Sequence, residues 1–265
     1  MFPDGKVSDF QRRQMTTVGA DNCHALAIDG SFDDCQTMVK DMFANQAFAS
    51  RVKLSAVNSI NWGRVMAQVV YYFTAATALG APEQKVSFAV PTGNFGDIYA
   101  GYVAKQMGLP IDRLVIATNE NDILARTLAT GNHKLGSVKA TITPSMDIQI
   151  SSNFERLLFE AAGRDSTMVR DLMAALKHDH NYSLPDEMLK FIRDSFDAGA
   201  VSEVETVDEV ARIFRDTGYI ADPHTAIAVK VAHDYADPEV PMVTLSTAHP
   251  AKFPDTVHDA TGKTA

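Results

Sequence analysis

A short segment with two glycines carries the residues best suited to bind a ligand. It lies between an apolar run and a helical pattern and reads Pro91-Thr92-Gly93-Asn94-Phe95-Gly96-Asp97. Glycines let the backbone approach a ligand closely, and successive amides at a helix start favour an anion such as phosphate. The spacing matches neither the Walker loop nor the dinucleotide fingerprint. The alternative is a tight strand-to-helix turn that needs glycine only for its geometry.

Polar side chains also precede the strongest helical pattern of the chain. Asn58, Ser59 and Asn61 lie directly before residues 62–76, in which apolar residues recur every three or four positions. Three small polar side chains at a helix start can bind an anion, but each is also a common N-cap residue. Capping is the interpretation that the residues alone favour.

A third polar cluster follows the last apolar run. Ser246 and Thr247 come at its end, and His249 and Lys252 follow. This is typical of the lip of a binding site, although Ser and Thr also end many strands without function. His224 lies in the first turn of another predicted helix, where the helix dipole disfavours its protonated form. We expect it to be neutral and structural.

Motifs for metal binding and for nucleophilic catalysis are missing. The sequence has neither a Gly-x-Ser-x-Gly turn nor a His-Glu-x-x-His pair. His178 and His180 are two residues apart, a spacing that does not place both on one helix face. Cys23 and Cys35 are the only cysteines, which excludes a disulfide framework and a four-thiolate zinc site. We expect no metal.

Short apolar runs alternate with longer helical patterns along the chain. Strands are predicted at 23–28, 53–57, 86–90, 114–118 and 241–245, and helices at 8–17, 33–43, 62–76, 97–106, 122–129, 153–162, 167–177, 185–196, 207–217 and 223–235. This alternation predicts an α/β fold with an open, mostly parallel sheet that helices cover on both faces. In such sheets, ligands bind beyond the carboxyl ends of the strands.

Length and composition limit the classes of function. The 265 residues, 46% of them hydrophobic, supply one large domain or two modest ones. With 24 basic and 33 acidic residues the net charge is −9, which argues against nucleic-acid binding because phosphate contacts need a dense basic face. Neither a membrane-length apolar stretch nor a signal-peptide pattern is present. We expect a cytoplasmic protein with no nucleic-acid or membrane partner.

Seven blocks of sequence, taken together, resemble those of the threonine synthase family. They follow the family order and together extend over essentially the whole chain. The blocks are GKVS (5–8) with QRRQM (11–15), FDDCQ (32–36), VNSINW (57–62), PTGNFGD (91–97), SSNFER (151–156), DPHTA (222–226) and STAHPAKF (246–253). The resemblance implies a fold type II pyridoxal-phosphate enzyme, of the tryptophan-synthase-β type.

The same resemblance implies a reaction. Threonine synthases convert O-phospho-L-homoserine and water into L-threonine and phosphate, the last step of threonine biosynthesis, with pyridoxal 5'-phosphate as cofactor. We therefore expect a small-molecule substrate and a lyase that acts on a phosphate ester. We expect the protein to be a monomer or a homodimer.

Individual roles carry over to matching positions only. The loop that holds the cofactor phosphate matches Gly93, Asn94, Phe95, Gly96 and Asp97. The hydroxyl that faces the pyridine nitrogen matches Thr247 or, as a second choice, Ser246. A neutral hydroxyl there leaves the ring nitrogen largely unprotonated. A role in lining the substrate site is inferred for Asn58, Ser59, Asn61, Ser151, Ser152 and Asn153.

One departure from the family is large. The Schiff-base lysine of the family lies in an upstream segment that reads like Phe-Lys-Asp, and no such segment occurs here. We therefore expect an N-terminally truncated chain, the C-terminal portion of the enzyme, with no catalytic lysine of its own and no activity alone. Residues 1–51 would be the remainder of the smaller N-terminal domain, and residues 52–265 the large cofactor-binding domain.

Two other functions stay open on the sequence. A relative without the lysine could act as a binding or regulatory protein rather than an enzyme. A related pyridoxal-phosphate lyase could act on another hydroxy- or phospho-amino acid, and phosphate release from phosphohomoserine would separate it from a threonine synthase.

Overall fold

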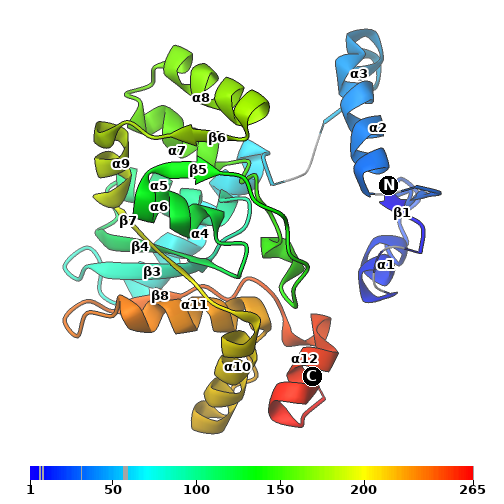
Figure 1. The fold of residues 1–265 in the computed structure, drawn as a ribbon. Coiled ribbons are helices and arrows are strands. Elements are labelled where there is room, and N and C mark those ends of the chain that lie inside the picture. Colours follow the sequence, from blue (N-terminus) through cyan, green and yellow to red (C-terminus); the bar gives the residue numbers. More distant parts are fainter. Residues whose placement is uncertain (6, 8, 31, 56–58, 265) are drawn as a thin grey trace. The chain divides into compact units, whose positions relative to one another are not determined.

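The computed structural model describes residues 1–5, 7, 9–30, 32–55 and 59–264, which fall into two compact units, residues 1–56 and 57–265 (Figure 1). The strand predicted at 53–57 is wrong over its described residues, because Lys53 is the left-handed C-cap of a helix that ends at Val52, and residues 54–55 are not in a strand. Residues 56–57 and Asn58 lie outside the described ranges. The assignment of residues 1–51 and 52–265 to a smaller and a larger domain stays a prediction.

The first unit is mainly helical. Strands β1 (Phe2–Pro3) and β2 (Ala27–Ile28) pair in parallel, and the helices are α1 (Asp9–Thr16), α2 (Phe32–Ala44) and α3 (Gln46–Val52). The helices predicted at 8–17 and 33–43 are confirmed. The strand predicted at 23–28 was too long, because only its last two residues pair with another strand.

The second unit is built on a four-stranded parallel sheet. Its strand order is β7 (Phe196–Ala200), β4 (Ile111–Thr118), β3 (Val86–Pro91) and β8 (Met242–Thr244). Phe88 pairs with Leu114, and Ala89 pairs with Thr244. All four strands run in one direction, so their carboxyl ends meet at one edge, as the predicted open parallel sheet requires.

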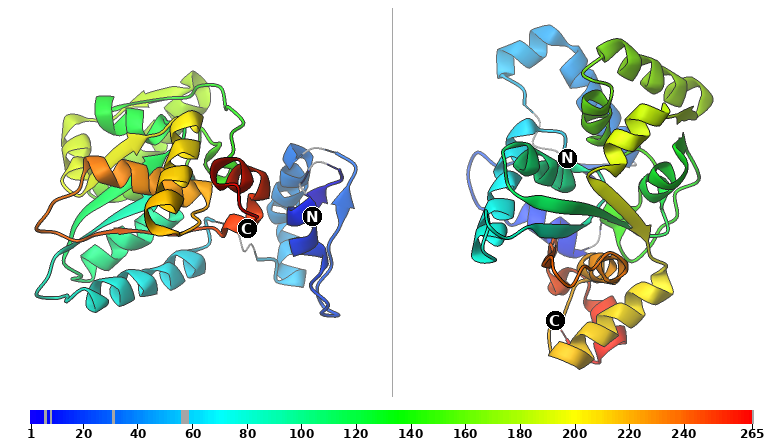
Figure 2. Two further views of the ribbon diagram at one scale, coloured as in Figure 1. Left: turned by 90° about the horizontal axis from the view of Figure 1, so that it is seen from below. Right: turned by 90° about the vertical axis from the view of Figure 1, so that its left-hand side faces the viewer.

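Helices cover both faces of this sheet (Figure 2). Alternate side chains of β3 and β4, such as Phe88 and Ile116, pack with α4 (Trp62–Ala78), α5 (Gly96–Gln106) and α6 (Ile123–Thr130). The smaller side chains on the other face, such as Ala89, pack against α11 (Pro223–Asp234). This alternation follows from the two-residue period of a strand.

The remaining elements connect and flank the sheet. They are β5 (Asn132–Lys134), η1 (Pro144–Met146), α7 (Phe154–Ala161), α8 (Ser166–Asp179), β6 (Asn181–Ser183), α9 (Asp186–Arg193), α10 (Glu203–Thr217), η2 (Pro250–Lys252) and α12 (Pro254–Thr261). Strands β5 and β6 form a separate antiparallel pair. The helix predicted at 185–196 was too long, since its last residue, Phe196, is already the first residue of β7.

No helix in the described part of the chain is long and apolar enough to cross a membrane. The described residues also contain no group of three or more His, Cys, Asp and Glu side chains arranged to bind a metal ion. Both cysteines have free thiols, and Cys35 is buried whereas Cys23 is exposed.

Candidate functional site

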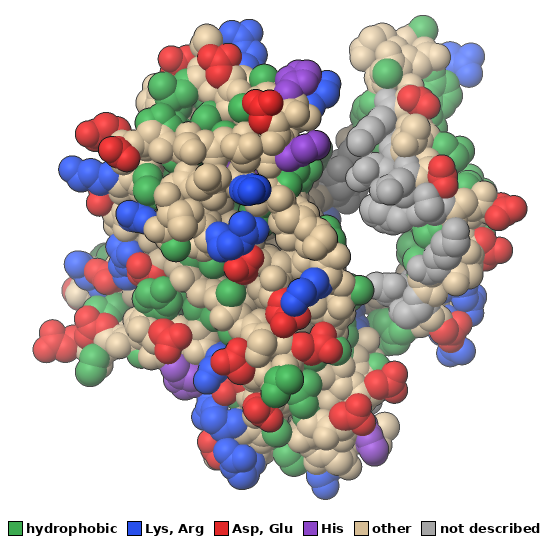
Figure 3. All heavy atoms as spheres, viewed as in Figure 1, with side chains coloured by type: hydrophobic (Ala, Val, Ile, Leu, Met, Phe, Trp, Pro, Cys, Tyr) green, Lys and Arg blue, Asp and Glu red, His purple; other side chains and the backbone are tan. Residues whose placement is uncertain are grey.

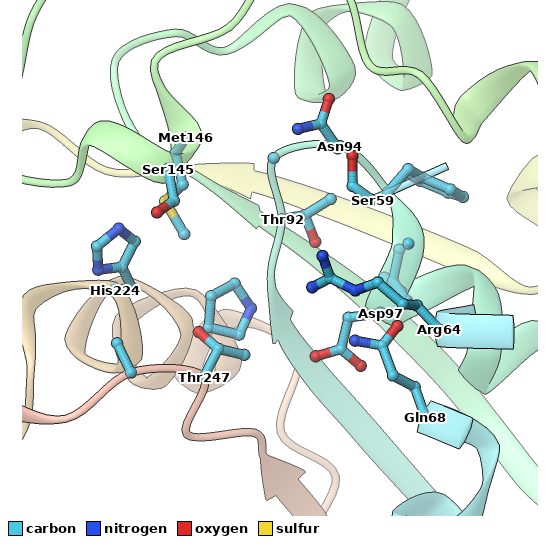
Figure 4. Close-up of a pocket in the computed structure, with 16 residues that line it drawn as sticks. Ser59, Arg64, Gln68, Thr92, Asn94, Asp97, Ser145, Met146, His224 and Thr247 are labelled. Carbon is cyan, nitrogen blue, oxygen red and sulfur yellow. The ribbon is translucent and has the colours of Figure 1, made fainter. Parts of the chain in front are cut away.

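A cavity of about 240 Å³ lies at the carboxyl ends of strands β3 and β8 (Figure 4). Its wall is formed by the loop between β3 and α5, the first two turns of α4, the first turn of α11, the turn η1 and the segment after β8. The lining residues are Ser59, Arg64, Gln68, residues 91–98, Ser145, Met146, His224, Thr247 and Ala248. The position agrees with the general rule for ligands in open parallel sheets.

The loop between β3 and α5 is held by aromatic packing. Phe95 has φ 63°, in the left-handed region that few residues other than glycine adopt. Its buried ring packs on Phe154 at 5.2 Å and on Phe196 at 5.7 Å between ring centroids. No side chain of the described residues caps the start of α5. An anion in the cavity is therefore a suitable partner for the first amides of this helix.

Ser151 and Asn153 brace the same loop by hydrogen bonds. Ser151 Oγ donates to the carbonyl of Gly93 at 2.8 Å, and Asn153 Nδ2 donates to the carbonyl of Asn94 at 2.8 Å. Asn153 Nδ2 also lies 2.9 Å from the carbonyl oxygen of Ser59. Gly93 itself has no room for a side chain, because a Cβ atom there would lie 2.2 Å from the carbonyl oxygen of Ser145.

Asp97 connects α5 to α4. Its Oδ1 accepts hydrogen bonds from the hydroxyls of Tyr71 at 2.6 Å and Tyr72 at 3.0 Å. Burial raises the pKa of Asp97, although these hydrogen bonds act in the opposite direction.

The two hydroxyls after β8 differ in their surroundings. Ser246 Oγ lies 3.2 Å from the hydroxyl of Thr225, which also bonds to the carboxylate of Asp222. The Thr247 side chain lines the cavity and makes no hydrogen bond to any described residue. Thr247 is therefore the hydroxyl that a ligand in the cavity can engage.

The cavity brings together Ser59, the loop residues 93–97 and Thr247, which are far apart in the sequence. Ser246 lines an adjoining pocket with Thr247. Ser152 and Asn153 line a second cavity of about 800 Å³. The side chain of Asn61 accepts a hydrogen bond from the amide of Gly63 and caps α4.

The role in lining a substrate site stays a prediction for Ser59, Asn61, Ser151, Ser152 and Asn153. Asn58, which we assigned the same role, lies outside the described residues. The hydrogen bonds of Ser151 and Asn153 add a second role, since they hold the loop.

Nine lining residues were not among the predicted site residues, namely Arg64, Gln68, Pro91, Thr92, Ile98, Ser145, Met146, His224 and Ala248. Arg64 and Gln68 are four residues apart on α4, so they share a helix face, and this spacing after the Asn58–Asn61 cluster was a usable signal. Ser145 and Met146 lie in η1, within a stretch that has no periodicity. No local sequence signal marks them.

Comparison with known proteins shows similarity over the whole chain. The family model "Threonine synthase, C-terminal" matches residues 225–265. Threonine synthase of Pseudomonas aeruginosa is 51% identical over 98% of this chain, which covers 56% of that relative. The Saccharomyces cerevisiae threonine synthase is 43% identical over 98% of the chain, covering 54% of the relative. The chain thus spans about half the length of the curated relatives it matches.

Solved structures agree with the sequence comparison. The pyridoxal-phosphate-bound threonine synthase from Brucella melitensis has a TM-score of 0.96 and 57% identity, over 100% of this chain and 57% of that one. The yeast threonine synthase has a TM-score of 0.88 and 41% identity, and the match covers 97% of this chain and 54% of the yeast chain. Maize serine racemase, with a TM-score of 0.53 and 13% identity over 86% and 61%, shares only the fold. The fold is that of the type II pyridoxal-phosphate enzymes, as expected.

Proposed function

The chain belongs to the threonine synthase family, which depends on pyridoxal phosphate, and from that premise we propose that it forms the cofactor-binding part of a threonine synthase. The complete enzyme would convert O-phospho-L-homoserine and water into L-threonine and phosphate. The observation that carries the proposal is one cavity that joins an uncapped helix start, a braced glycine loop and the Thr247 hydroxyl.

The cavity suits the phosphate end of the cofactor. The loop packs against the Ser145 carbonyl only because residue 93 has no side chain, and the uncapped amides at the start of α5 match an anion. Residues 93–97 would hold the phosphate through backbone N–H groups. The braces from Ser151 and Asn153 would keep these groups in place before the ligand arrives, which reduces the entropy lost on binding.

The cavity also suits the ring end. Bound pyridoxal phosphate supplies an electron sink for breaking bonds at the α-carbon of an amino acid. In our assignment the Thr247 hydroxyl faces the ring nitrogen and, being neutral, leaves it largely unprotonated. Ser246 is the second choice for this role, and its contact with Thr225 makes it less available.

Other properties of the complete protein belong to the same proposal. We propose that it is cytoplasmic, a monomer or a homodimer, and without a nucleic-acid partner, which agrees with its net charge of −9 and its two free thiols. A binding protein without catalysis is not favoured, because the similarity to threonine synthases extends over 98% of the chain.

The test is a chimera. This chain is joined to the part of the Pseudomonas aeruginosa threonine synthase that it does not match, and phosphate release from O-phosphohomoserine is measured. We expect activity from the chimera and none from the 265-residue chain alone. A folded chimera that binds pyridoxal phosphate but releases no phosphate would contradict the proposed reaction.

A second measurement separates the reaction from neighbouring ones. The chimera is offered O-phosphohomoserine, O-phosphoserine and serine, and the amino-acid products are identified. Threonine formed only from the first substrate supports the proposal. Turnover of either serine compound in its place would favour a related lyase.

A further inference from the structure

The imidazole of His224 is the most unusual polar group in the described part of the chain. Its Nδ1 and Nε2 are the only buried side-chain nitrogen or oxygen atoms there that make no hydrogen bond. The residue is only 3% exposed, so bulk water does not replace the missing partners. Buried polar groups without a hydrogen-bond partner are rare and destabilising. We therefore expect a bound molecule to supply a partner for the imidazole nitrogens.

The surroundings of the ring fix its position. His224 follows Pro223 in the first turn of α11, and its Nδ1 lies 3.3 Å from a carboxylate oxygen of Asp222. That oxygen accepts a hydrogen bond from the backbone amide of His224 at 2.9 Å. The Phe253 ring packs against the imidazole, with 5.0 Å between centroids. The imidazole is thus positioned by Phe253 and by the 3.3 Å contact of its Nδ1 with Asp222, while neither ring nitrogen makes a hydrogen bond to a described residue.

The ring lines the same cavity as the glycine loop. Figure 4 shows His224 and Thr247 on one side and Arg64, Thr92 and Asp97 on the other. Asp222 is the ionisable residue that contacts the imidazole, and Arg64 on α4 and Asp97 on α5 are the other ionisable residues that line the cavity. An unpartnered, buried donor and acceptor beside a cavity is suited to contact whatever fills that cavity.

We infer that His224 is a positioning residue that hydrogen-bonds, directly or through one water, to the ring portion of a phosphorylated pyridine in this cavity. This rests on the proposed function, and it replaces the purely structural role that the sequence suggested. The phosphate would be held by residues 93–97, so a ligand without a ring would leave His224 unpartnered. His224 thereby distinguishes the cofactor from a simple phosphate.

The test uses the 265-residue chain and two probes, pyridoxine 5'-phosphate and inorganic phosphate. Pyridoxine phosphate has no aldehyde and therefore does not modify the lysines of the chain. Binding is followed by calorimetry and by the ¹⁵N resonances of the imidazole nitrogens. We expect pyridoxine phosphate to shift the His224 resonances, and inorganic phosphate to leave them within experimental error.

Variants give the second readout. We expect His224→Phe to weaken pyridoxine-phosphate binding about tenfold, or 1.4 kcal/mol, with less than a twofold effect on inorganic phosphate. His224→Asn, which keeps a donor and an acceptor, should recover part of the loss. His233→Asn, at an exposed histidine of the same helix, is the matched control and should bind both probes normally.

The outcomes separate the two proposals. If the chain binds neither probe, the proposed cofactor cavity and this inference both fail. If pyridoxine phosphate binds but the His224 resonances do not move, or His224→Phe binds it as tightly as the unchanged chain, only this inference is overturned. The resonance shift is measured on the unchanged chain, so it decides the question even if a variant fails to fold.

Discussion

At the residue scale, the shape of the cavity depends on close contacts made by three residues of the segment 93–97. Gly93 lies against the backbone of η1, Phe95 is held in a left-handed conformation by two aromatic rings, and Asp97 is tied to Tyr71 and Tyr72. These contacts serve the loop rather than a ligand. They explain how a loop with few side chains suited to binding can still present its backbone in a fixed arrangement.

Gly93→Ala should disrupt the loop, because its Cβ would lie 2.2 Å from the Ser145 carbonyl oxygen and the backbone would have to move. We expect at least a tenfold loss of inorganic-phosphate binding and a loss of roughly 1–3 kcal/mol in the free energy of unfolding. Calorimetry and urea unfolding measure the two effects. Gly136→Ala is the control, since its Cβ would meet only ordinary contacts, the nearest at 3.5 Å. Equal phosphate binding by both variants would contradict the assignment of the loop.

Thr247→Asp should lower turnover of the chimera by about two orders of magnitude. A carboxylate facing the ring nitrogen would raise the pKa of that nitrogen by roughly 1–3 units and favour its protonated form. Phosphate release from O-phosphohomoserine measures the effect. Thr167→Asp, an equal change of charge at the exposed start of α8, controls for net charge. Unchanged turnover of Thr247→Asp would reject the assignment of Thr247.

Sequence patterns predicted part of this site for a clear reason. The glycine loop and the hydroxyls at 246–247 directly follow predicted strands, which is where ligands bind in α/β sheets. Their residue types and their position in the chain therefore both indicated a ligand site. His224 was assigned a structural role because a helix dipole was the only local information. The structure shows that its ring nitrogens make no hydrogen bond to any residue in the described ranges and that the residue lines the cavity. Both facts depend on Phe253 and on the loop after β3, which are distant from His224 in the sequence.

At the element scale, the parallel sheet was predictable because its two central strands are rich in β-branched residues. Strand β7 was not, because its sequence Phe-Asp-Ala-Gly-Ala has neither alternation nor β-branched residues. Tertiary contacts make it a strand. Arg113 of β4 donates two hydrogen bonds of 2.6 Å to the carboxylate of Asp197 in β7, and Gly199 leaves room for Val231 of α11.

His133 in β5 should make the stability of the chain depend on pH. Its ring is buried and stacked on Tyr182, with 4.7 Å between centroids, and its Nδ1 lies 2.8 Å from the hydroxyl of Thr127. Burial, with a smaller effect of Arg126, lowers its pKa from 6.5 to about 4. Between these values the unfolded chain binds more protons than the folded chain, so stability is complete above pH 6.5 and falls as the pH decreases.

The size of this effect follows from the same pKa values. The free energy of unfolding should be about 2 kcal/mol lower at pH 5 than at pH 7.5. Urea unfolding at the two pH values measures this difference. His133→Asn lacks the titrating group and should lose about that much of the difference. An unchanged pH dependence in His133→Asn would show that other groups are responsible.

At the scale of the whole molecule, the apolar clusters are distributed unequally between the two units. Among the residues that the structure describes, three clusters of buried hydrophobic side chains form, and they lie within residues 65–260. The cavity lies in the same range apart from Ser59 and Arg64. The first unit has two-residue strands, and among those of its residues whose burial is described only Phe2, Pro3 and Cys35 are buried. The contacts that create the candidate site are therefore internal to residues 59–265.

Residues 59–265 should consequently fold without the first unit. Because their clusters supply the apolar burial that drives folding, we expect cooperative urea unfolding, with a free energy within about 1 kcal/mol of the same transition in the full chain. Trp62, the only tryptophan, lies at the start of α4 and reports this transition by fluorescence. A version starting at residue 52, the predicted domain boundary, should behave identically and bind inorganic phosphate equally well. Non-cooperative unfolding of both versions would show that residues 1–51 belong to the same folding unit, and the predicted boundary would then be wrong.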